Sequence, residues 1–285
     1  MSNHGVLDIG GEPVLYDSEK VLKPDIVTVF LAQHAAQLYF GMYLGGCSRE
    51  QARVLEIGIG SGAFSVAFAK ATRNLVGSEC EIVINGTDIS NDALEIADKN
   101  LSLARGRGLI DGFDLKQTDY LADASDDSIY DVIYFNPPYL KPGTKLRDEF
   151  VGSPEVSVYT ESPCQHYQVI LPYIANHLSV GPFPDGGYGI ARLPGDGGLS
   201  LRNDFLIDNN QLDLPQLLKP DRNDRLITYD ENHWSVMNRN ARFAIMQTAK
   251  VDSESSGVFL NRSFPPSDWT DNQYQNNESL TKTVL

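Results

Sequence analysis

The stretch that determines the predicted fold is Arg53–Phe64, which reads RVLEIGIGSGAF. Its first residues, Arg53–Ile57, form a short apolar run that is typical of a buried strand in a parallel sheet. Three glycines at alternate positions follow, Gly58, Gly60 and Gly62, and small and apolar residues come after them. Strand, glycine turn and buried helix in this order predict a nucleotide-binding βα unit, whose glycines let the backbone approach a ligand closely.

An acid inside this unit sets it apart from a pyrophosphate site. The pattern is E-x-G-x-G-x-G, in which Glu56 stands at the end of the strand, rather than G-x-G-x-x-G. A carboxylate so close to the turn would repel a pyrophosphate. The pattern therefore favours a cationic ligand, such as a sulfonium that carries a free amino group.

Acids also end the next two predicted strands. Glu81–Asp88 is an apolar strand that ends at Asp88, where a βαβ fold places the acid that binds ribose hydroxyls. Phe113–Thr118 is a further strand, and Asp119 after it can accept a hydrogen bond from an adenine amino group. Because the carboxyl ends of parallel strands meet at one edge of a sheet, we expect one site there.

The fourth strand candidate, Asp131–Phe135, runs directly into Asn-Pro-Pro-Tyr at 136–139. The side-chain carbonyl of Asn136 can accept a hydrogen bond from a substrate NH2 group. Pro137 has a fixed φ, so its carbonyl can be aimed at the same nitrogen, and Tyr139 can pack against a planar amide or base. Two acceptors on one NH2 group hold its lone pair toward an electrophile, which indicates methyl transfer to a weakly nucleophilic nitrogen.

The combination of EIGIGSG, TDISNDAL, QTDY and FNPPY resembles the class I S-adenosylmethionine-dependent methyltransferases. Within them it is most similar to the HemK/PrmC branch, whose members methylate a glutamine side-chain amide in translation release factors. The resemblance covers about residues 14–196 and implies S-adenosyl-L-methionine as the cofactor. It implies that Asn136, Pro137 and Tyr139 are catalytic. The cofactor-binding residues that it implies are Glu56, Gly58, Gly60, Gly62, Asp88, Ile89, Asp119, Tyr120 and Asn136.

The chain departs from this family at its N-terminus. Leu22–Thr28 is similar to the family's L-x-P-R-x-E-T segment, but Asp25 replaces the arginine and Val27 replaces the glutamate. Only about fifty residues precede the glycine turn, which predicts a short helical lid rather than a full recognition domain.

We therefore expect three parts: a lid over 1–50, a catalytic domain over 51–250 and a polar tail over 251–285. Within the catalytic domain, 197–242 is interpreted as an insert, either a surface elaboration or a substrate-recognition segment. The predicted fold is α/β, a doubly wound, mainly parallel, seven-stranded Rossmann-like methyltransferase sheet with an antiparallel edge strand. Its strand candidates are Arg53–Ile57, Glu81–Asp88, Phe113–Thr118, Asp131–Phe135, Gly189–Leu193 and, as the edge partner, Arg242–Lys250.

Composition limits the possible partners. The net charge is −15, from 38 acids and 23 bases, and the bases are dispersed. A nucleic-acid enzyme needs Lys and Arg to neutralise phosphates, so this balance disfavours nucleic acid.

Three scattered cysteines and no apolar run long enough for a bilayer predict a cytoplasmic protein without a membrane segment. The histidines form no cluster, so no metal is expected, and His166 is interpreted as packed or solvated.

The predicted reaction is methyl transfer to an amide-type nitrogen of a protein or peptide side chain. Three alternatives stay open at this point: an N-methyltransferase of small molecules or natural products, an adenine-N6 methyltransferase of DNA or RNA, and a noncatalytic subunit with the methyltransferase fold. The oligomeric state is not predicted.

Overall fold

The computed structural model describes residues 4–44, 50–119, 128–138, 140, 142–143, 152–160, 166, 169–170, 173–174, 177–179, 187–193, 224–228 and 242–250. The predicted site residues Tyr120 and Tyr139 lie outside this part, as do the predicted tail and most of the predicted insert. Within these ranges, no helix has the length and apolar character needed to span a membrane.

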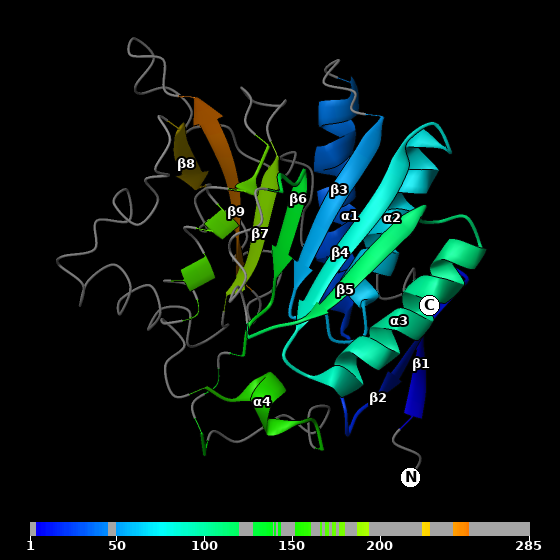
Figure 1. Cartoon of the computed structure of the whole chain (residues 1–285), viewed down its shortest axis with the longest axis vertical. Helices are drawn as coiled ribbons and strands as arrows, with labels where there is room; N and C mark the ends of the chain where they lie inside the picture. Colours follow the sequence, from blue (N-terminus) through cyan, green and yellow to red (C-terminus); the bar gives the residue numbers. More distant parts are fainter. Residues whose placement is uncertain are drawn as a thin grey trace, which may run out of the picture.

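One seven-stranded sheet forms the centre of the molecule (Figure 1). Its strand order is β5-β4-β3-β6-β7-β9-β8, and the first five of these strands pair in parallel. The strands are β3 (Gln51–Ile57), β4 (Glu81–Asp88), β5 (Gly112–Gln117), β6 (Val132–Phe135), β7 (Tyr188–Leu193), β8 (Asp224–Thr228) and β9 (Arg242–Lys250).

The predicted doubly wound, mainly parallel fold is confirmed. From β3 the chain moves outward through β4 to β5, and then returns to place β6 on the other side of β3. The strand order reverses between β3 and β6, and open α/β sheets bind ligands at the carboxyl ends of strands at such a point.

The antiparallel strand differs from its prediction in one respect. β9 lies between β7 and β8 and is antiparallel to both, so the predicted edge position of Arg242–Lys250 is wrong. The edge strand is β8, which falls inside the segment interpreted as an insert. Its residues, Asp-Arg-Leu-Ile-Thr, do not alternate between polar and apolar, so the two-residue periodicity by which a half-buried strand is recognised is missing.

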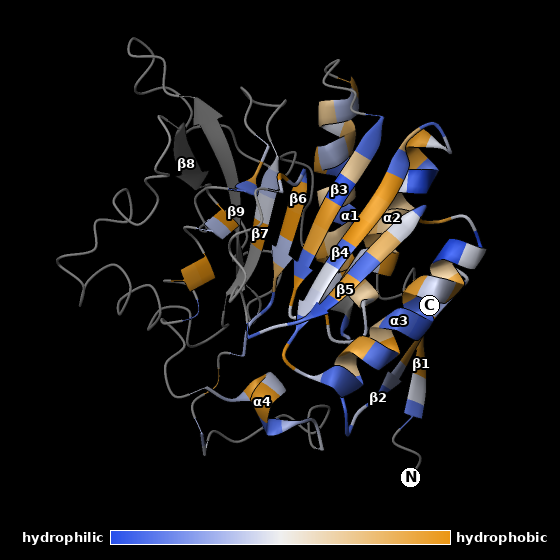
Figure 2. Ribbon diagram, viewed as in Figure 1, coloured by the Kyte–Doolittle hydropathy of each residue, from blue (hydrophilic) through white to orange (hydrophobic). Residues whose placement is uncertain are grey.

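Three long helices complete the core: α1 (Ile26–Leu44), α2 (Ala63–Val76) and α3 (Asn91–Gly106). In Figure 1, α1 and α2 lie behind the sheet and α3 lies beside β5. The central strands β3, β4 and β6 are the most hydrophobic part of the sheet (Figure 2). α1 packs on α2, with the ring centroids of Tyr39 and Phe68 6.2 Å apart in an edge-to-face arrangement. The N-terminal helix is thus a buried layer of the core.

A β-hairpin that the sequence did not predict precedes α1. It consists of β1 (His4–Ile9) and β2 (Glu12–Asp17) and lies against α3. Its anchor is the buried amide of Asn100, whose Oδ1 accepts from the Leu15 N–H at 2.9 Å. The Nδ2 group of Asn100 donates to the carbonyls of Leu15 and Ser61, both at 2.8 Å. One side chain therefore joins the hairpin and α3 to the glycine turn.

Candidate active site

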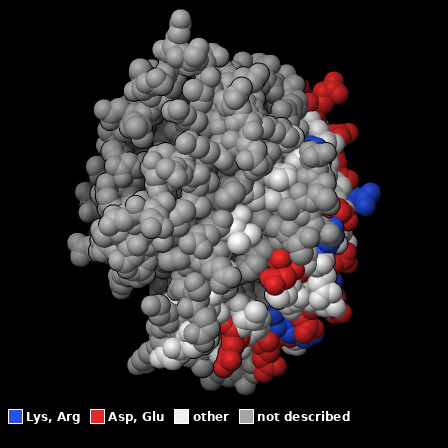
Figure 3. All heavy atoms as spheres, turned by 60° about the vertical axis from the view of Figure 1, so that its left-hand side comes forward, with Lys and Arg blue, Asp and Glu red and all other residues white. Residues whose placement is uncertain are grey.

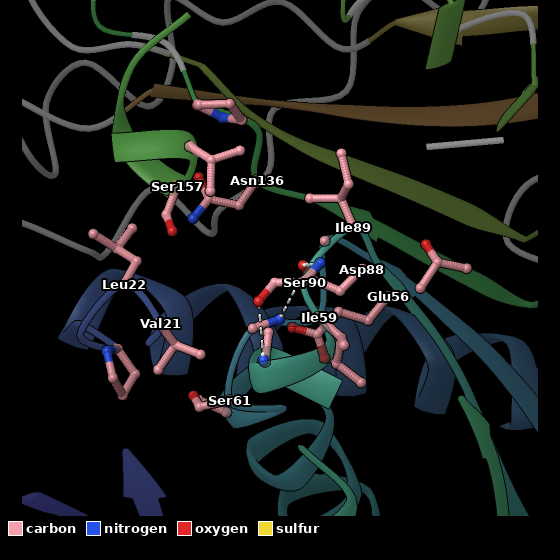
Figure 4. Close-up of a pocket in the computed structure, with 18 of the residues that line it drawn as sticks. Val21, Leu22, Glu56, Ile59, Ser61, Asp88, Ile89, Ser90, Asn136 and Ser157 are labelled. Carbon is pink, nitrogen blue, oxygen red and sulfur yellow. Dashed lines mark hydrogen bonds between the residues drawn. The ribbon is translucent and has the colours of Figure 1, made fainter. Parts of the chain in front are cut away.

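A cavity of about 710 Å³ lies at the carboxyl ends of β3, β4, β5 and β6. Three groups of residues line it: the strand ends, the segment 20–25 that leads into α1, and residues 156–160 around the short helix α4 (Glu155–Val158). In Figure 4, Val21 and Leu22 lie across the cavity from Asp88, and Asn136 lies close to Ser157.

The cavity brings together most of the residues that the sequence singled out. Those that line it are Glu56, Gly58, Gly60, Asp88, Ile89, Asp119 and Asn136. Gly62 and Pro137 are not among its lining residues, and Pro137 is buried. Tyr120 and Tyr139 stay predictions because they lie outside the described ranges.

The glycine turn is built from three residues with positive φ: +69° at Gly58, +53° at Gly60 and +73° at Gly62. A Cβ added at Gly58 or Gly60 would meet no atom within 4 Å, so backbone conformation, and not protein packing, requires glycine there. At Gly62, the N-cap of α2, a Cβ would lie 3.8 Å from Ala97. The first two glycines therefore shape the cavity wall, while Gly62 shapes the start of α2 beside α3.

Glu56 is the deepest acid of the cavity, with only 3% of its surface exposed. Its Oε2 accepts hydrogen bonds from the Ser65 hydroxyl at 2.5 Å and the Ser65 N–H at 3.1 Å. Burial is the main cause that raises the pKa of Glu56 to about 8, and the nearby Asp88 contributes to the rise. The two hydrogen bonds from Ser65 act in the opposite direction. A cation in the cavity would favour the ionised carboxylate.

Asp88 ties the end of β4 to the turns on either side of it. Its Oδ2 accepts from the Gly60 N–H and its Oδ1 from the Ser90 N–H, both at 2.9 Å. Burial raises the pKa of Asp88 in spite of these hydrogen bonds. Beside it, the Thr118 N–H donates to the Asp88 carbonyl at 3.0 Å, which brings Asp119 to the same wall.

Asn136 occupies the end of β6 on the opposite wall. The ring of Tyr134, two residues earlier, stacks on Phe64 with centroids 3.8 Å apart, which fixes the strand end against α2. The Oδ1 atom of Asn136 is buried and has no hydrogen-bond partner among the described residues. An unsatisfied buried carbonyl is costly. A half-turn of the amide would present this oxygen to a donor in the cavity.

The wall beside Asn136 is made of chain segments that pair with each other. The Leu140 N–H donates to the Val158 carbonyl at 3.1 Å, and the Thr160 N–H donates to the Leu140 carbonyl at 2.8 Å. The chain just after the Asn-Pro-Pro-Tyr motif is therefore held against residues 158–160. The described lining residues on this side are Asn136, Pro138, Val156, Ser157, Tyr159, Thr160, His166 and Val169, and they include no Lys, Arg, Asp or Glu.

Two parts of the lining were not expected from the sequence. His166 borders the cavity, with its Nε2 2.8 Å from the Thr160 hydroxyl, and burial lowers its pKa. The segment 20–25 borders it as well. Asp25 at its end is the N-cap of α1, since its Oδ1 accepts from the Thr28 N–H at 2.9 Å and the Thr28 hydroxyl at 3.0 Å. This Asp-x-x-Thr spacing after a proline was a signal for the helix start.

Acids outnumber bases on part of the described surface. On the face that Figure 3 shows, acidic side chains dominate the described surface and few basic ones lie between them. Among the described residues, no group of three or more His, Cys, Asp and Glu is placed to hold a metal ion.

The chain was compared with known proteins. It is 28% identical to a release factor glutamine methyltransferase of Lactococcus lactis over 142 residues, which is 48% of this chain and 47% of that protein. It is 37% identical to the enzyme of the same name from Rhodopirellula baltica over 92 residues, 32% of this chain and 28% of that one. The chain thus spans half or less of the length of these relatives, and no family model matches it.

A solved structure with the same fold comes from Pyrococcus horikoshii and is described as a transferase. It superposes with a TM-score of 0.50 at 10% identity, over 88% of this chain and 74% of the other. At this identity the likeness concerns the fold alone. The sequence relatives agree with the resemblance carried by the glycine turn and by Asn136–Tyr139, since all four significant ones are release factor glutamine methyltransferases.

Proposed function

We propose that the chain is an S-adenosylmethionine-dependent N-methyltransferase that acts on an amide-type nitrogen of a protein or peptide side chain. The observation that carries the proposal is the Oδ1 atom of Asn136, which is buried at the end of β6, where Asn136 lines the cavity, and has no hydrogen-bond partner among the described residues. The four relatives, named release factor glutamine methyltransferases, support it.

The residues of the cavity fit this cofactor. S-adenosylmethionine supplies an electrophilic methyl group on a sulfonium, together with an amino-acid end and an adenosine end. Glu56 would hold the cationic end, because a buried carboxylate with an open cavity before it favours a positive charge. Asp88 would accept hydrogen bonds from the ribose, and Asp119 would lie at the adenine.

The amide to be methylated would be bound on the wall of Asn136. The Asn136 carbonyl would accept an N–H of the substrate and withdraw the nitrogen lone pair from resonance as positive charge develops on the N–H bonds. Positioning supplies the larger part of the rate, since a well-aligned pair of reactants is worth up to about 7–11 kcal/mol. The sulfonium's bond to the methyl carbon would break as the new N–C bond forms, which would leave a neutral thioether. One N–H proton would then pass to water, so that the product is a neutral N-methyl amide.

The absence of fixed charge on the described part of this wall favours a neutral acceptor. An adenine in DNA or RNA brings phosphates, which need Lys and Arg around the site. The lysines that line the cavity, Lys20 and Lys23, belong to the segment 20–25 rather than to the wall of Asn136, and acids outnumber bases on the described surface that Figure 3 shows. A small neutral amide is the alternative acceptor, because the same uncharged wall would accommodate it.

The experiment that tests the proposal uses methyl-labelled S-adenosylmethionine. The chain is incubated with peptides containing glutamine or asparagine, with a small-molecule amide, and with single- and double-stranded DNA and RNA at low salt. We expect label in a peptide and weak binding of nucleic acid. Label in N6-methyladenine, with tight and salt-sensitive binding, would put adenine methylation first, and label in no acceptor despite cofactor binding would favour a noncatalytic role.

A further inference from the structure

The charged side chains that line the cavity come mainly from the strand ends and from the segment 20–25. Glu56, Asp88 and Asp119 come from the ends of β3, β4 and β5. The segment 20–25, whose Val21 and Leu22 lie across the cavity from Asp88 in Figure 4, contributes two lysines, Lys20 and Lys23, and one acid, Asp25, whose Oδ1 is bonded to Thr28. A ligand that carries cationic and anionic groups at one end can therefore lie with its cations toward the strand ends and its anion toward this segment.

The segment 20–25 is held at both ends. Val21 is buried at 2% exposure against Ala93 and Ile96 of α3. Asp25 caps α1 through its two hydrogen bonds to Thr28. Between these anchors, Lys23 is placed at the cavity by the backbone on both sides.

The two lysines differ in what already engages them. The Lys20 ammonium forms an ion pair with Asp92 of α3, at 2.8 Å. The Lys23 ammonium lies 6.0 Å from the centre of the Tyr16 ring, a contact that leaves its hydrogen-bond donors available to another group. Of the two lysines, Lys23 is therefore the one whose ammonium group is available to an anion in the cavity.

We propose that Lys23 binds the carboxylate of the cofactor's amino-acid end and so selects the carboxylated form of the ligand. This inference rests on the proposed function, because it takes S-adenosylmethionine as the ligand. It assigns to Lys23 a binding role that acts on affinity and orientation, and not a chemical step.

The test compares two ligands that differ only in this carboxylate: S-adenosylmethionine and decarboxylated S-adenosylmethionine. Their affinities are measured by calorimetry for the whole chain and for Lys23→Met, Lys23→Arg and Lys99→Met. Lys99 is an exposed lysine of α3 that does not line the cavity, so its variant makes the same change in net charge elsewhere.

For Lys23→Met we expect the affinity for S-adenosylmethionine to fall about fivefold, the size typical of a partly exposed ion pair. The affinity for the decarboxylated ligand should stay unchanged. Lys23→Arg should keep the preference for the carboxylated ligand, and Lys99→Met should leave both affinities as they are. The loss in Lys23→Met should shrink at high salt, where exposed charges are screened.

Two results would overturn the inference, and they are distinguishable. If the unmodified chain binds S-adenosylmethionine but Lys23→Met lowers both affinities equally or neither of them, Lys23 does not bind the carboxylate and the proposed function stands. If the unmodified chain binds neither ligand, the proposed function fails and the role of Lys23 fails with it.

Discussion

The two walls of the cavity differ in how far they are complete without a ligand. On the wall at the ends of β3 and β4, the carboxylates are already bonded to the protein: Glu56 to Ser65, and Asp88 to Gly60 and Ser90. On the wall at the end of β6, the Asn136 carbonyl has no partner among the described residues. The first wall is organised by its own hydrogen bonds, whereas the second leaves an acceptor unsatisfied.

We expect this difference to assign cofactor binding to the wall at β3 and β4 and the methyl-transfer step to the wall at β6. A wall that is already organised holds a ligand without rearrangement, and its acids set which charge that ligand carries. A wall with an unsatisfied acceptor gains most from a group that donates to it, as an amide NH2 does in the proposed reaction. Variants on the two walls should therefore change different quantities, affinity on one and turnover on the other.

The largest expected effect is on the β6 wall. Asn136→Ala should lower the turnover number about 10²–10³-fold, the usual result of removing one preorganised partner of the transition state. The affinity for S-adenosylmethionine should change little, because the acids on the other wall remain. Steady-state kinetics together with calorimetry measures both quantities.

The matched control is Asn74→Ala, which makes the same change at an exposed residue of α2 that does not line the cavity. It should keep near-normal turnover if the effect is specific to the cavity. Near-normal turnover in Asn136→Ala itself would mean that the Asn-Pro-Pro-Tyr segment does not hold the acceptor. The unsatisfied acceptor on the β6 wall would then have no role in turnover.

The next effect is on the β4 wall. Asp88→Ala should weaken the binding of S-adenosylmethionine roughly 10- to 100-fold, since a charge-assisted hydrogen bond contributes about 1.5–3 kcal/mol. Asp98→Ala, at an exposed acid of α3 outside the cavity, makes the same change in charge and should leave affinity unchanged. Equal affinities for the two variants would remove Asp88 from the ligand site.

The smallest effect concerns Glu56 and the pH. Because burial raises its folded-state pKa from 4.5 to about 8, the folded chain binds more protons than the unfolded chain between these values. The free energy of unfolding without ligand should therefore fall as the pH rises through this window. Glu56→Gln should remove that fall and make the unliganded protein more stable than the parent at pH 8, while weakening cofactor binding.

Chemical unfolding at several pH values, with and without S-adenosylmethionine, measures both consequences of Glu56→Gln. A variant that is less stable than the parent at pH 8, or that binds the cofactor equally well, would show that the carboxyl of Glu56 is structural. In that case the first wall would owe its charge preference to Asp88 and Asp119 alone.

Much of this site could be predicted because it lies at the ends of strongly patterned strands. The run before Glu56 and the alternate glycines after it identify β3 and its turn, and Glu81–Asp88 is a strand with the bounds that were predicted. Acids or amides that end successive parallel strands must meet at one edge of the sheet. The cavity at Glu56, Asp88 and Asn136 follows from that geometry.

The parts that could not be predicted depend on contacts between distant segments. The β1–β2 hairpin is held by Asn100, 85 residues further along the chain, and its own strands are short and partly exposed. The approach of Lys23 and His166 to the cavity depends on how loops pack, for which a sequence carries no periodic signal. The edge position of β8 depends on pairing with β9 and is likewise not local.

The most direct test of the account is the site of methylation on a peptide glutamine. The chain is incubated with S-adenosylmethionine carrying a ¹³C-methyl group and a peptide whose glutamine side-chain nitrogen is ¹⁵N. We expect a product in which ¹³C is bonded to ¹⁵N, which NMR detects as a one-bond coupling. The coupling should be absent from the product mixture of Asn136→Ala. A methyl group on another atom of the peptide, or on adenine N6 when nucleic acid is supplied, would contradict it.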